Sequence, residues 1–564
     1  MRKPTLTVAL SILALLLALP CPARAQVQIE DGPLPAEVQA RALEILNDPG
    51  TLRLPGGARI PSGTRIDGDV AVLSGSVVVG GEVSGLLLVV NGDLTLQPGA
   101  VVDGQVLVVG GVVEGADQAR LPTGAVAYRA PLRYRIRGGR VQGVPEEGLT
   151  PGFLESDFGF GRSRVTLRAG SNYNRVEGLP VQVGPIIETR GRNPLRLEAF
   201  GTWRSVSGLE LDSEDMGYRF RLEQAAGGRG EIFLGATAHR EIVPVEERGM
   251  STLEASLSTF FLRRDLRDYY EREGWQAYAA FRPARAPLQA TVAYRHEDHA
   301  TALVQSPWTL RSSSGRPWRD QFRAASGPFR AVEGEVLWDS RDDPYLPADG
   351  WWARAFLQRQ VGGALSADLF SGATEADRFT SGSLDVRRYA RVSPDVRLLL
   401  RGVVSGSVND TPLPAQFQQA LGGEGSLPGH PRFAQDCGAR DEVFDGPGGP
   451  PDPSYPFYGC DRTALFQAEL QGRLPFAWNP VPPGWEQWEW AALLDLQPRW
   501  ALLFNAGRGW VAGDPPAGSP RVDSPTRADV GLGLFVGPLG LYWAYPLNRR
   551  DQGVNFFIRL QQRF

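Results

Sequence analysis

Alternating apolar and polar side chains run through most of the chain, and this pattern constrains the fold more than any other feature. From residue 162 to the end, segments of roughly ten residues each have one apolar and one polar face. In 396–408 one face is apolar or glycine throughout, whereas the other carries Arg397 and Arg401. Because successive side chains of a strand point to opposite faces, this period predicts an all-β region.

The first 25 residues have the organisation of a secretion signal. Arg2 and Lys3 form a positive n-region, 6–19 is an apolar h-region, and 23–25 is a small-x-small cleavage site. We therefore expect a signal peptide over 1–25 and an exported mature chain that begins at Gln26.

Two architectures fit exported strands of this kind. In a soluble sandwich the polar face meets water outside, whereas in an outer-membrane barrel the apolar face meets lipid and the polar face lines the lumen. Export and a length of 564 residues favour a 16-stranded antiparallel transmembrane β-barrel, with both ends of the barrel on the periplasmic side. The expected strands are 163–173, 195–205, 216–224, 231–242, 252–263, 274–283, 288–299, 329–340, 350–361, 378–392, 395–409, 463–474, 498–510, 527–537, 539–547 and 554–564.

The end of the chain is an amphipathic segment that finishes on an aromatic residue. Stepping back by twos from Phe564 passes Leu560, Ile558 and Phe556. This looks like the outer-membrane sorting signal that the barrel-assembly machinery reads. It implies that this machinery is a partner during biogenesis, that outer-membrane lipid surrounds the protein, and that the cell is of the Gram-negative type.

Residues 51–127 carry a different period. Stepping by six from Ile60 to Val108 finds apolar aliphatic residues at eight of nine positions, and glycine recurs every twelve residues from Gly56 to Gly104. A six-residue period predicts a β-helix with short strands on flat sides and glycine at corners. A small periplasmic β-sandwich is the alternative. The segment resembles bactofilin-type β-helices, which implies self-association, or a spacer or docking cap for periplasmic or envelope proteins.

These segments divide the chain into five parts. We expect a signal peptide over 1–25, a short helix at 35–47 within a 26–50 linker, and the β-helix over 51–127 in the periplasm. A Gly-, Pro- and Arg-rich linker over 128–161 then leads to the barrel over 162–564.

Four places in the barrel region carry motifs. A strand-turn-strand motif comprises Asp339, Arg341, Asp342, Pro347 and Gly350. A long external loop, 410–462, contains Leu427, Pro428, Gly429 and His430. A later strand contains Phe504, Asn505 and Gly507, and 540–564 forms a terminal hairpin.

The order and spacing of this set resemble the bacterial surface antigen superfamily of BamA/TamA-like outer-membrane proteins, in a branch without transport-associated repeats; 174–179 fits the same branch. The resemblance identifies 410–462 as the sixth external loop, called loop 6 below. In the family its tip carries an Arg-Gly-aromatic motif whose Arg pairs with an Asp on a later strand. Here the position of the Arg is Pro428, that of the aromatic residue is His430, and that of the Asp is Asn505. We therefore expect that ion pair to be absent. Arg432 reaching Glu469 or Asp495 is an alternative anchor.

We expect the remaining candidate residues to have structural rather than catalytic or metal-binding roles. Cys437 and Cys460 lie in one exported loop, which predicts a disulfide rather than a metal site. His296 and His299 predict a solvated loop at a strand end rather than a metal pair, and Asp339 with Asp342 predicts a turn rather than an acid/base pair. No nucleophile elbow, phosphate loop or zinc motif is present in the sequence. We expect no enzyme activity, no catalytic or metal residues, no cofactor and no nucleic-acid partner.

The resemblance implies a role in assembling or exporting envelope components, protein or lipid, by a non-covalent mechanism. A weak seam between 163–173 and 554–564 would open laterally. A passive channel with an Arg-rich lumen and a structural anchor for the β-helix are the alternatives.

Overall fold

The computed structural model describes residues 27–143 and 152–560, apart from internal gaps. The gaps are 31–33, 56–57, 74, 129, 131, 133, 138–139, 159–160, 170–171, 190–192, 209–215, 228–230, 247–249, 284–285, 312–317, 320, 343–346, 367–377, 394, 439–457, 476–497, 515–520, 537–538 and 549–552. The chain divides into two compact units, Met1–Val144 and Pro145–Phe564. The expected signal peptide and Phe564 lie outside the described residues.

The N-terminal unit is a β-helix of parallel strands, which excludes the sandwich alternative. Its three sheets have the orders β1-β13-β11-β8-β5-β2, β10-β7-β4 and β12-β9-β6-β3. Its elements are β1(Val27–Glu30), α2(Ala36–Asn47), β2(Leu52–Pro55), β3(Arg59–Ile60), β4(Arg65–Ile66), β5(Val70–Leu73), β6(Val77–Val79), β7(Glu82–Val83), β8(Leu87–Val90), β9(Leu94–Leu96), β10(Val101–Val102), β11(Val106–Val109), β12(Val113–Glu114), η1(Ala116–Gln118) and β13(Ala125–Tyr128).

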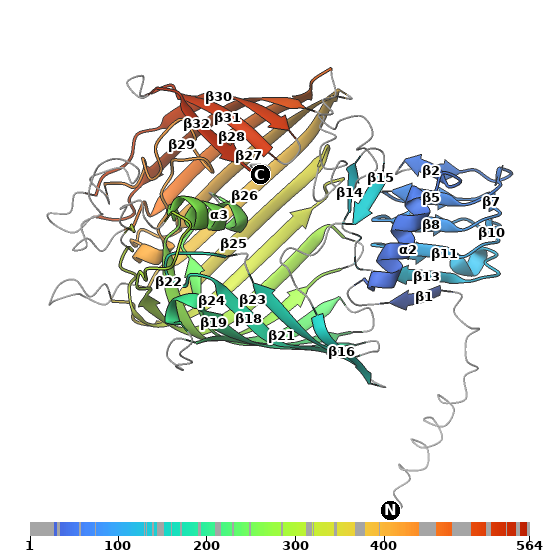
Figure 1. Ribbon diagram of the computed structural model, residues 1–564, viewed down its shortest axis with the longest axis horizontal. Coiled ribbons are helices and arrows are strands. Elements are labelled where there is room, and N and C mark those ends of the chain that lie inside the picture. Colours follow the sequence, from blue (N-terminus) through green and yellow to red (C-terminus); the bar gives the residue numbers. More distant parts are fainter. Residues whose placement is uncertain are drawn as a thin grey trace, which may run out of the picture. The chain divides into compact units, whose positions relative to one another are not determined.

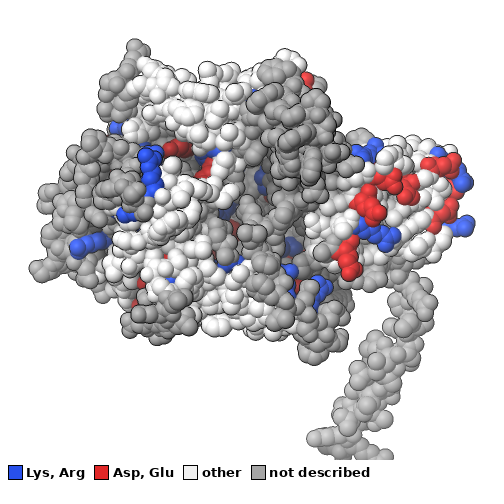
Figure 2. Space-filling view, in the orientation of Figure 1, with Lys and Arg blue, Asp and Glu red and all other residues white. Residues whose placement is uncertain are grey.

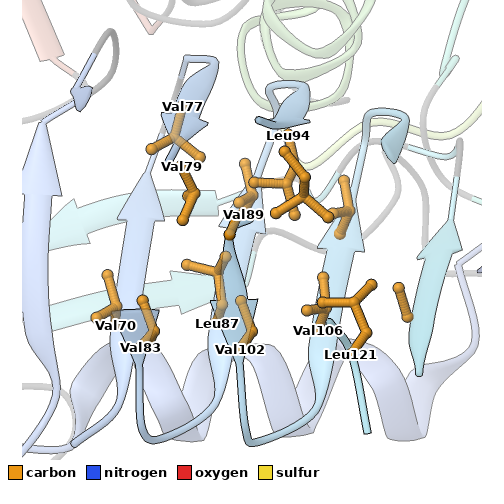
Figure 3. Close-up of a cluster of buried hydrophobic side chains, with 14 of the residues drawn as sticks. Val70, Val77, Val79, Val83, Leu87, Val89, Leu94, Val102, Val106 and Leu121 are labelled. Carbon is orange, nitrogen blue, oxygen red and sulfur yellow. The ribbon is translucent and has the colours of Figure 1, made fainter. Parts of the chain in front are cut away.

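Stacked coils form the core of this unit. Val70 lies opposite Leu87 and Leu87 opposite Val106, so successive coils are 17 and 19 residues long. These lengths agree with a coil of three sides of six residues each. The aliphatic side chains of neighbouring coils meet in the interior (Figure 3). A Cβ on Gly92 would lie 2.1 Å from the carbonyl oxygen of Gly75 on the preceding coil, which explains why this corner needs glycine.

One face of the β-helix is covered by α2 and by a hairpin. Ala42 and Leu46 of α2 are fully buried, and the Asn47 side chain hydrogen-bonds both the N–H and the carbonyl of Val141. The hairpin is β14(Tyr134–Arg137) with β15(Arg140–Gly143). The expected linker over 128–161 is therefore wrong in part, because it contains this hairpin and the first strand of the next unit.

The second unit is one antiparallel sheet of seventeen strands, each paired with its neighbours in sequence (Figure 1). The predicted fold class, an all-β chain with sixteen antiparallel strands after a small β-helix, is confirmed for β17–β32, and β16 precedes them. The strands are β16(Gly152–Phe158), β17(Gly161–Ala169), β18(Pro180–Thr189), β19(Leu195–Arg204), β20(Gly217–Ala226), β21(Ile232–Pro244), β22(Tyr269–Phe281), β23(Leu288–Thr301), β24(Gly327–Asp339), β25(Gly350–Gly363), β26(Thr380–Ser393), β27(Val396–Ser407), β28(Arg462–Arg473), β29(Arg499–Trp510), β30(Arg527–Val536), β31(Leu539–Pro546) and β32(Asn555–Arg559). The short helices are η2(Ser205–Ser207) and η4(Ala415–Phe417).

The structure has a helix at one expected strand and a strand that was not expected. Residues 252–263 form the helix α3(Thr252–Leu262), because Ser251 and Glu254 make a capping box that the alternating pattern concealed. The sequence analysis also missed β18, whose Gly184 and Pro185 interrupt the apolar pattern. The ladder between β18 and β19 skips both residues, as at an irregularity in a strand.

The edges of this sheet define a seam. Among the described residues, no backbone ladder joins β32 to β16 or β17. In the same described part of the chain, no helix is long and apolar enough to cross a membrane.

Candidate functional site

The outer face of the sheet is apolar. Every strand from β18 to β32 exposes at least one large hydrophobic side chain, and the described surface of this unit in Figure 2 is mostly free of Lys, Arg, Asp and Glu. These residues are Val183, Leu197, Phe220, Leu222, Ile232, Leu234, Trp275, Phe281, Val292, Val332, Val336, Trp338, Trp351, Leu357, Val361, Leu384, Val392, Val404, Phe466, Leu502, Phe504, Val530, Leu532, Trp543, Phe556 and Ile558. We call these exposed side chains the apolar band. Phe504, Phe556 and Ile558, which belong to motifs of the sequence analysis, are part of it.

The opposite face of the sheet is polar and buried. A continuous row of hydrogen bonds crosses five neighbouring strands, β26 to β30, and we call it the polar row. Its members are Asp385, Arg401, Gln467, Asn505 and Asp529. The consecutive distances are 2.7 Å from Arg401 Nη2 to Asp385 Oδ2, 3.3 Å from Arg401 Nη1 to Gln467 Oε1, 3.3 Å from Gln467 Nε2 to Asn505 Oδ1, and 2.7 Å from Asn505 Nδ2 to Asp529 Oδ1.

Loop 6 docks onto the last member of this row. The backbone N–H of Gly429 donates to Asp529 Oδ2 at 3.0 Å, and His430 Nε2 lies 3.2 Å from the carbonyl oxygen of Ala528. A Cβ on Gly429 would lie 2.5 Å from the Cβ of Asp529, so this close approach requires glycine. The tip of loop 6 is therefore folded against the inner face of the sheet, which sequence reasoning left open.

Two other members of the loop 6 motif complete the dock. Asn555 Nδ2 on β32 donates to the carbonyl oxygen of Pro428 at 3.2 Å. The fully buried Leu427 packs in one cluster with Val403, Leu421 and Leu465. The tip is thus held by backbone groups of Pro428 and Gly429, which bind Asn555 and the Asp529 carboxylate, and by the packing of Leu427.

Arg432 has a partner that the sequence analysis did not consider. Its Nη2 lies 3.1 Å from Glu424 Oε2 within the same loop, and its Nη1 donates to the carbonyl of Leu266. Glu424 and Arg432 are only eight residues apart, so a spacing argument restricted to later strands could not find this pair. Asp495, one of the two expected partners, lies outside the described residues.

A disulfide within loop 6 joins its middle to the residues just before β28. Cys437 and Cys460 are joined, and an isolated bridge pairs Gln419 with Cys460. Gly507, a motif residue on β29, lies under the loop, because a Cβ there would approach Leu421 Cδ1 at 3.0 Å.

The Asp339 motif builds the turn between β24 and β25. Asp339 Oδ1 accepts from Arg341 Nε at 2.8 Å, and Asp342 Oδ1 accepts the backbone N–H groups of Ala348 and Asp349. Gly350 has a φ of 117° and lies against the backbone of Ser340. Both carboxylates therefore have structural partners. The carbonyl of Pro347 accepts from Arg397 Nη1 at 3.0 Å, which links the turn to β27.

The segment 174–179, which follows β17, contains a buried ion network. Arg175 is 0% exposed, and its Nη2 lies 2.8 Å from Asp268 Oδ1. Its backbone N–H donates to Asp265 Oδ2 at 2.9 Å. Arg319 also pairs with Asp268, so four charged groups share one buried site that ties this segment to the chain after α3.

The expectation of a solvated loop at 296–299 is wrong. β23 continues to Thr301, so Glu297 and His299 lie on the same inner face. Glu297 Oε1 lies 3.1 Å from His239 Nε2, and Glu297 Oε2 lies 3.2 Å from His299 Nε2. No group of three or more His, Cys, Asp or Glu side chains in the described ranges is arranged to hold a metal ion.

A cavity of about 310 Å³ opens beside His239 on the inner face. Its lining includes Arg219, Arg221, Arg272 and Arg282 together with Glu198, Glu241, Glu333 and Glu335. The sequence analysis expected an Arg-rich lumen, but it did not anticipate that glutamates would accompany the arginines. Arg219 and Arg272 both pair with Glu241.

A scan against protein-family models and a search of the curated proteins give no match for this sequence. Among solved structures, the chain is similar to BamA from Haemophilus ducreyi lacking POTRA domains 1–3, with 15% identity, coverage of 73% of this chain and 74% of that chain, and a TM-score of 0.41. It is also similar to CdiB from Acinetobacter baumannii, with 10% identity, coverage of 78% and 63%, and a TM-score of 0.30. CdiB from Escherichia coli gives 13%, 74% and 64%, and 0.30.

These likenesses are remote, and the chain spans less than two thirds of either CdiB chain. The resemblance to the bacterial surface antigen family therefore rests on this chain's own motifs and on where the structure places them.

Proposed function

We propose that the second unit is an outer-membrane β-barrel whose apolar band faces lipid. The observation that carries this proposal is the combination of an exposed apolar outer face on every strand from β18 to β32 with a buried polar row inside. Water-soluble monomers rarely expose apolar patches beyond a few hundred Å². In a bilayer the exposure of the same face is favourable, because each apolar side chain contacts lipid hydrocarbon instead of water. The β-helix then belongs to the periplasmic side, where it is available to envelope proteins.

Within this setting, the function that the geometry supports best is non-covalent assembly or export of envelope components, protein or lipid. Two features support it: the seam beside β32, and loop 6, which docks on β30 and reaches β32 through Asn555. An edge strand offers unpaired backbone groups to an incoming strand. Assembly or export by a non-covalent mechanism needs no catalytic residues, and we propose that the protein is not an enzyme.

A folding assay tests this proposal. Purified protein in liposomes should accelerate the folding of an unfolded client barrel relative to empty liposomes. Asp529→Ala, which removes the acceptor of the loop 6 tip, should accelerate folding less than the parent protein, whereas Asp410→Ala should match the parent, because the Asp410 side chain is 86% exposed and far along the loop from the docked tip. A client folding rate equal to that in empty liposomes would contradict an assembly role.

A passive channel is a second candidate, favoured by the cavity of about 310 Å³ lined by paired arginines and glutamates. Single-channel recording in planar bilayers distinguishes it. A channel should give steady conductance, and its ion selectivity should shift toward cations in Arg219→Gln and Arg221→Gln. An assembly factor should give no steady, ion-selective current.

A further inference from the structure

Helix α3 lies at the seam and contacts the chain on both sides of it. The ladder between β16 and β17 covers residues 161–166 of β17 and does not extend to 167–169. In Figure 1 α3 lies between the teal and red ends of the sheet, and hydrogen bonds described next connect it to both.

On the β32 side, one carboxylate does two tasks. Glu254 Oε2 accepts the N–H of Ser251 at 3.0 Å and completes the capping box of α3. Glu254 Oε1 accepts from Arg559 Nε at 2.8 Å and from the backbone N–H of Leu560 at 2.7 Å. The N–H of Leu560 continues β32 at the edge of the sheet, so Glu254 binds a backbone donor that a neighbouring strand would otherwise use.

On the β17 side, the helix is held through Tyr173. Its backbone N–H donates to Ser256 Oγ at 2.9 Å, and its ring packs edge-on against Phe260 with centroids 5.3 Å apart. The chain leaving α3 is fixed to the same side, because Asp265 and Asp268 bind the buried Arg175. Both ends of α3 are thus anchored across the seam.

The polarity of α3 is the reverse of a water-soluble helix. Its buried side chains include Glu254, Ser256 and Thr259, whereas Leu253, Phe261 and Leu262 are 45%, 46% and 50% exposed. A helix on a soluble protein buries its apolar stripe and exposes its polar face. The apolar patch continues into Trp308 and Leu310, which are 62% and 60% exposed and contact Phe260.

We propose that α3 closes the seam between the first and last strands as part of the barrel wall, and that its exposed apolar face contacts the acyl chains of the membrane lipid. The inference rests on the proposed membrane location of the barrel. Lipid is the occupant because the helix is inverted in polarity and because β32, which it contacts, exposes Phe556 and Ile558 in the apolar band.

Spin labels on single added cysteines test the lipid contact in the full chain, since both native cysteines of the mature part are in the disulfide. In liposomes, labels at Leu262→Cys and Phe556→Cys should collide readily with oxygen and poorly with a water-soluble nickel chelate, whereas Asp410→Cys should show the opposite. If Phe556→Cys is accessible to nickel, the proposed membrane location fails. If Phe556→Cys is in lipid and Leu262→Cys is in water, or is shielded from both reagents by a bound protein, only the inference about α3 is overturned.

A second measurement tests the bridge itself. Glu254→Gln weakens the contact with Arg559, so amide hydrogen exchange of 555–560 should become about tenfold faster. Arg559→Gln, which leaves the capping box of α3 intact, should speed the exchange in the same way, and Glu37→Gln in α2 should leave it unchanged. Exchange at 555–560 that is identical in Glu254→Gln and the parent protein would show that α3 does not hold β32.

Discussion

At the residue scale, the centre of the candidate site is a carboxylate that the sequence analysis did not single out. Asp529 is 0% exposed and accepts from both Asn505 and Gly429. Asn505 and Pro428 drew attention as departures from the family motif, whereas Asp529 lies one strand further on. Its sequence signal is a single carboxylate within 528–536, whose other residues are apolar or glycine.

We expect Asp529→Ala to loosen loop 6. The substitution leaves two buried donors without this acceptor, and each such group costs about 1–3 kcal/mol. Limited proteolysis of the folded protein should show faster cleavage within 410–438, with Asp410→Ala as the exposed control. Equal cleavage rates for both variants would show that Asp529 does not anchor the loop.

Gly429→Ala tests the same contact from the side of the loop. The added Cβ would lie 2.5 Å from the Cβ of Asp529, so we expect destabilisation of about 1–3 kcal/mol from overpacking. Gly402→Ala is the matched control, because a Cβ there meets nothing within 4 Å. Denaturant unfolding should separate the two variants, and equal midpoints would contradict the close approach.

At the scale of elements, α3 shows how one local motif can override an alternating pattern. Leu253, Ala255 and Leu257 alternate with polar residues as in a strand, yet the capping box of Ser251 and Glu254 starts a helix. The same Glu254 carboxylate then binds β32, so the residue that begins the helix also positions it.

At the scale of the whole molecule, the two units have separate cores. The β-helix buries stacked aliphatic side chains such as Val89 and Leu87, whereas the sheet unit buries polar side chains on its inner face and exposes apolar ones outside. The mean hydropathy of the whole chain therefore averages over two opposite arrangements: apolar side chains are inside in the β-helix and outside in the sheet unit.

We expect Leu87→Ala to destabilise the β-helix alone. Its side chain is 0% exposed, and removing it from a packed core costs about 2–5 kcal/mol. Calorimetry of the full chain should show one transition shifted to lower temperature and the other unchanged. Leu52→Ala, at a side chain 45% exposed, should shift neither by a comparable amount. A shift of both transitions in Leu87→Ala would show that the units unfold together.

The sequence by itself determined the kind of strand in each unit, because the direction of a side chain is a local property: a period of two separates the faces of the sheet, and a period near six builds the sides of the β-helix. Local reasoning failed at α3, where Glu254 both caps the helix and binds β32. It also failed at β18, where glycine and proline interrupt the strand. Only the tertiary structure decided how loop 6 docks on Asp529 and how α3 spans the seam. Arg559 and Glu254 are 305 residues apart, and no local pattern records which distant groups meet when the sheet curves.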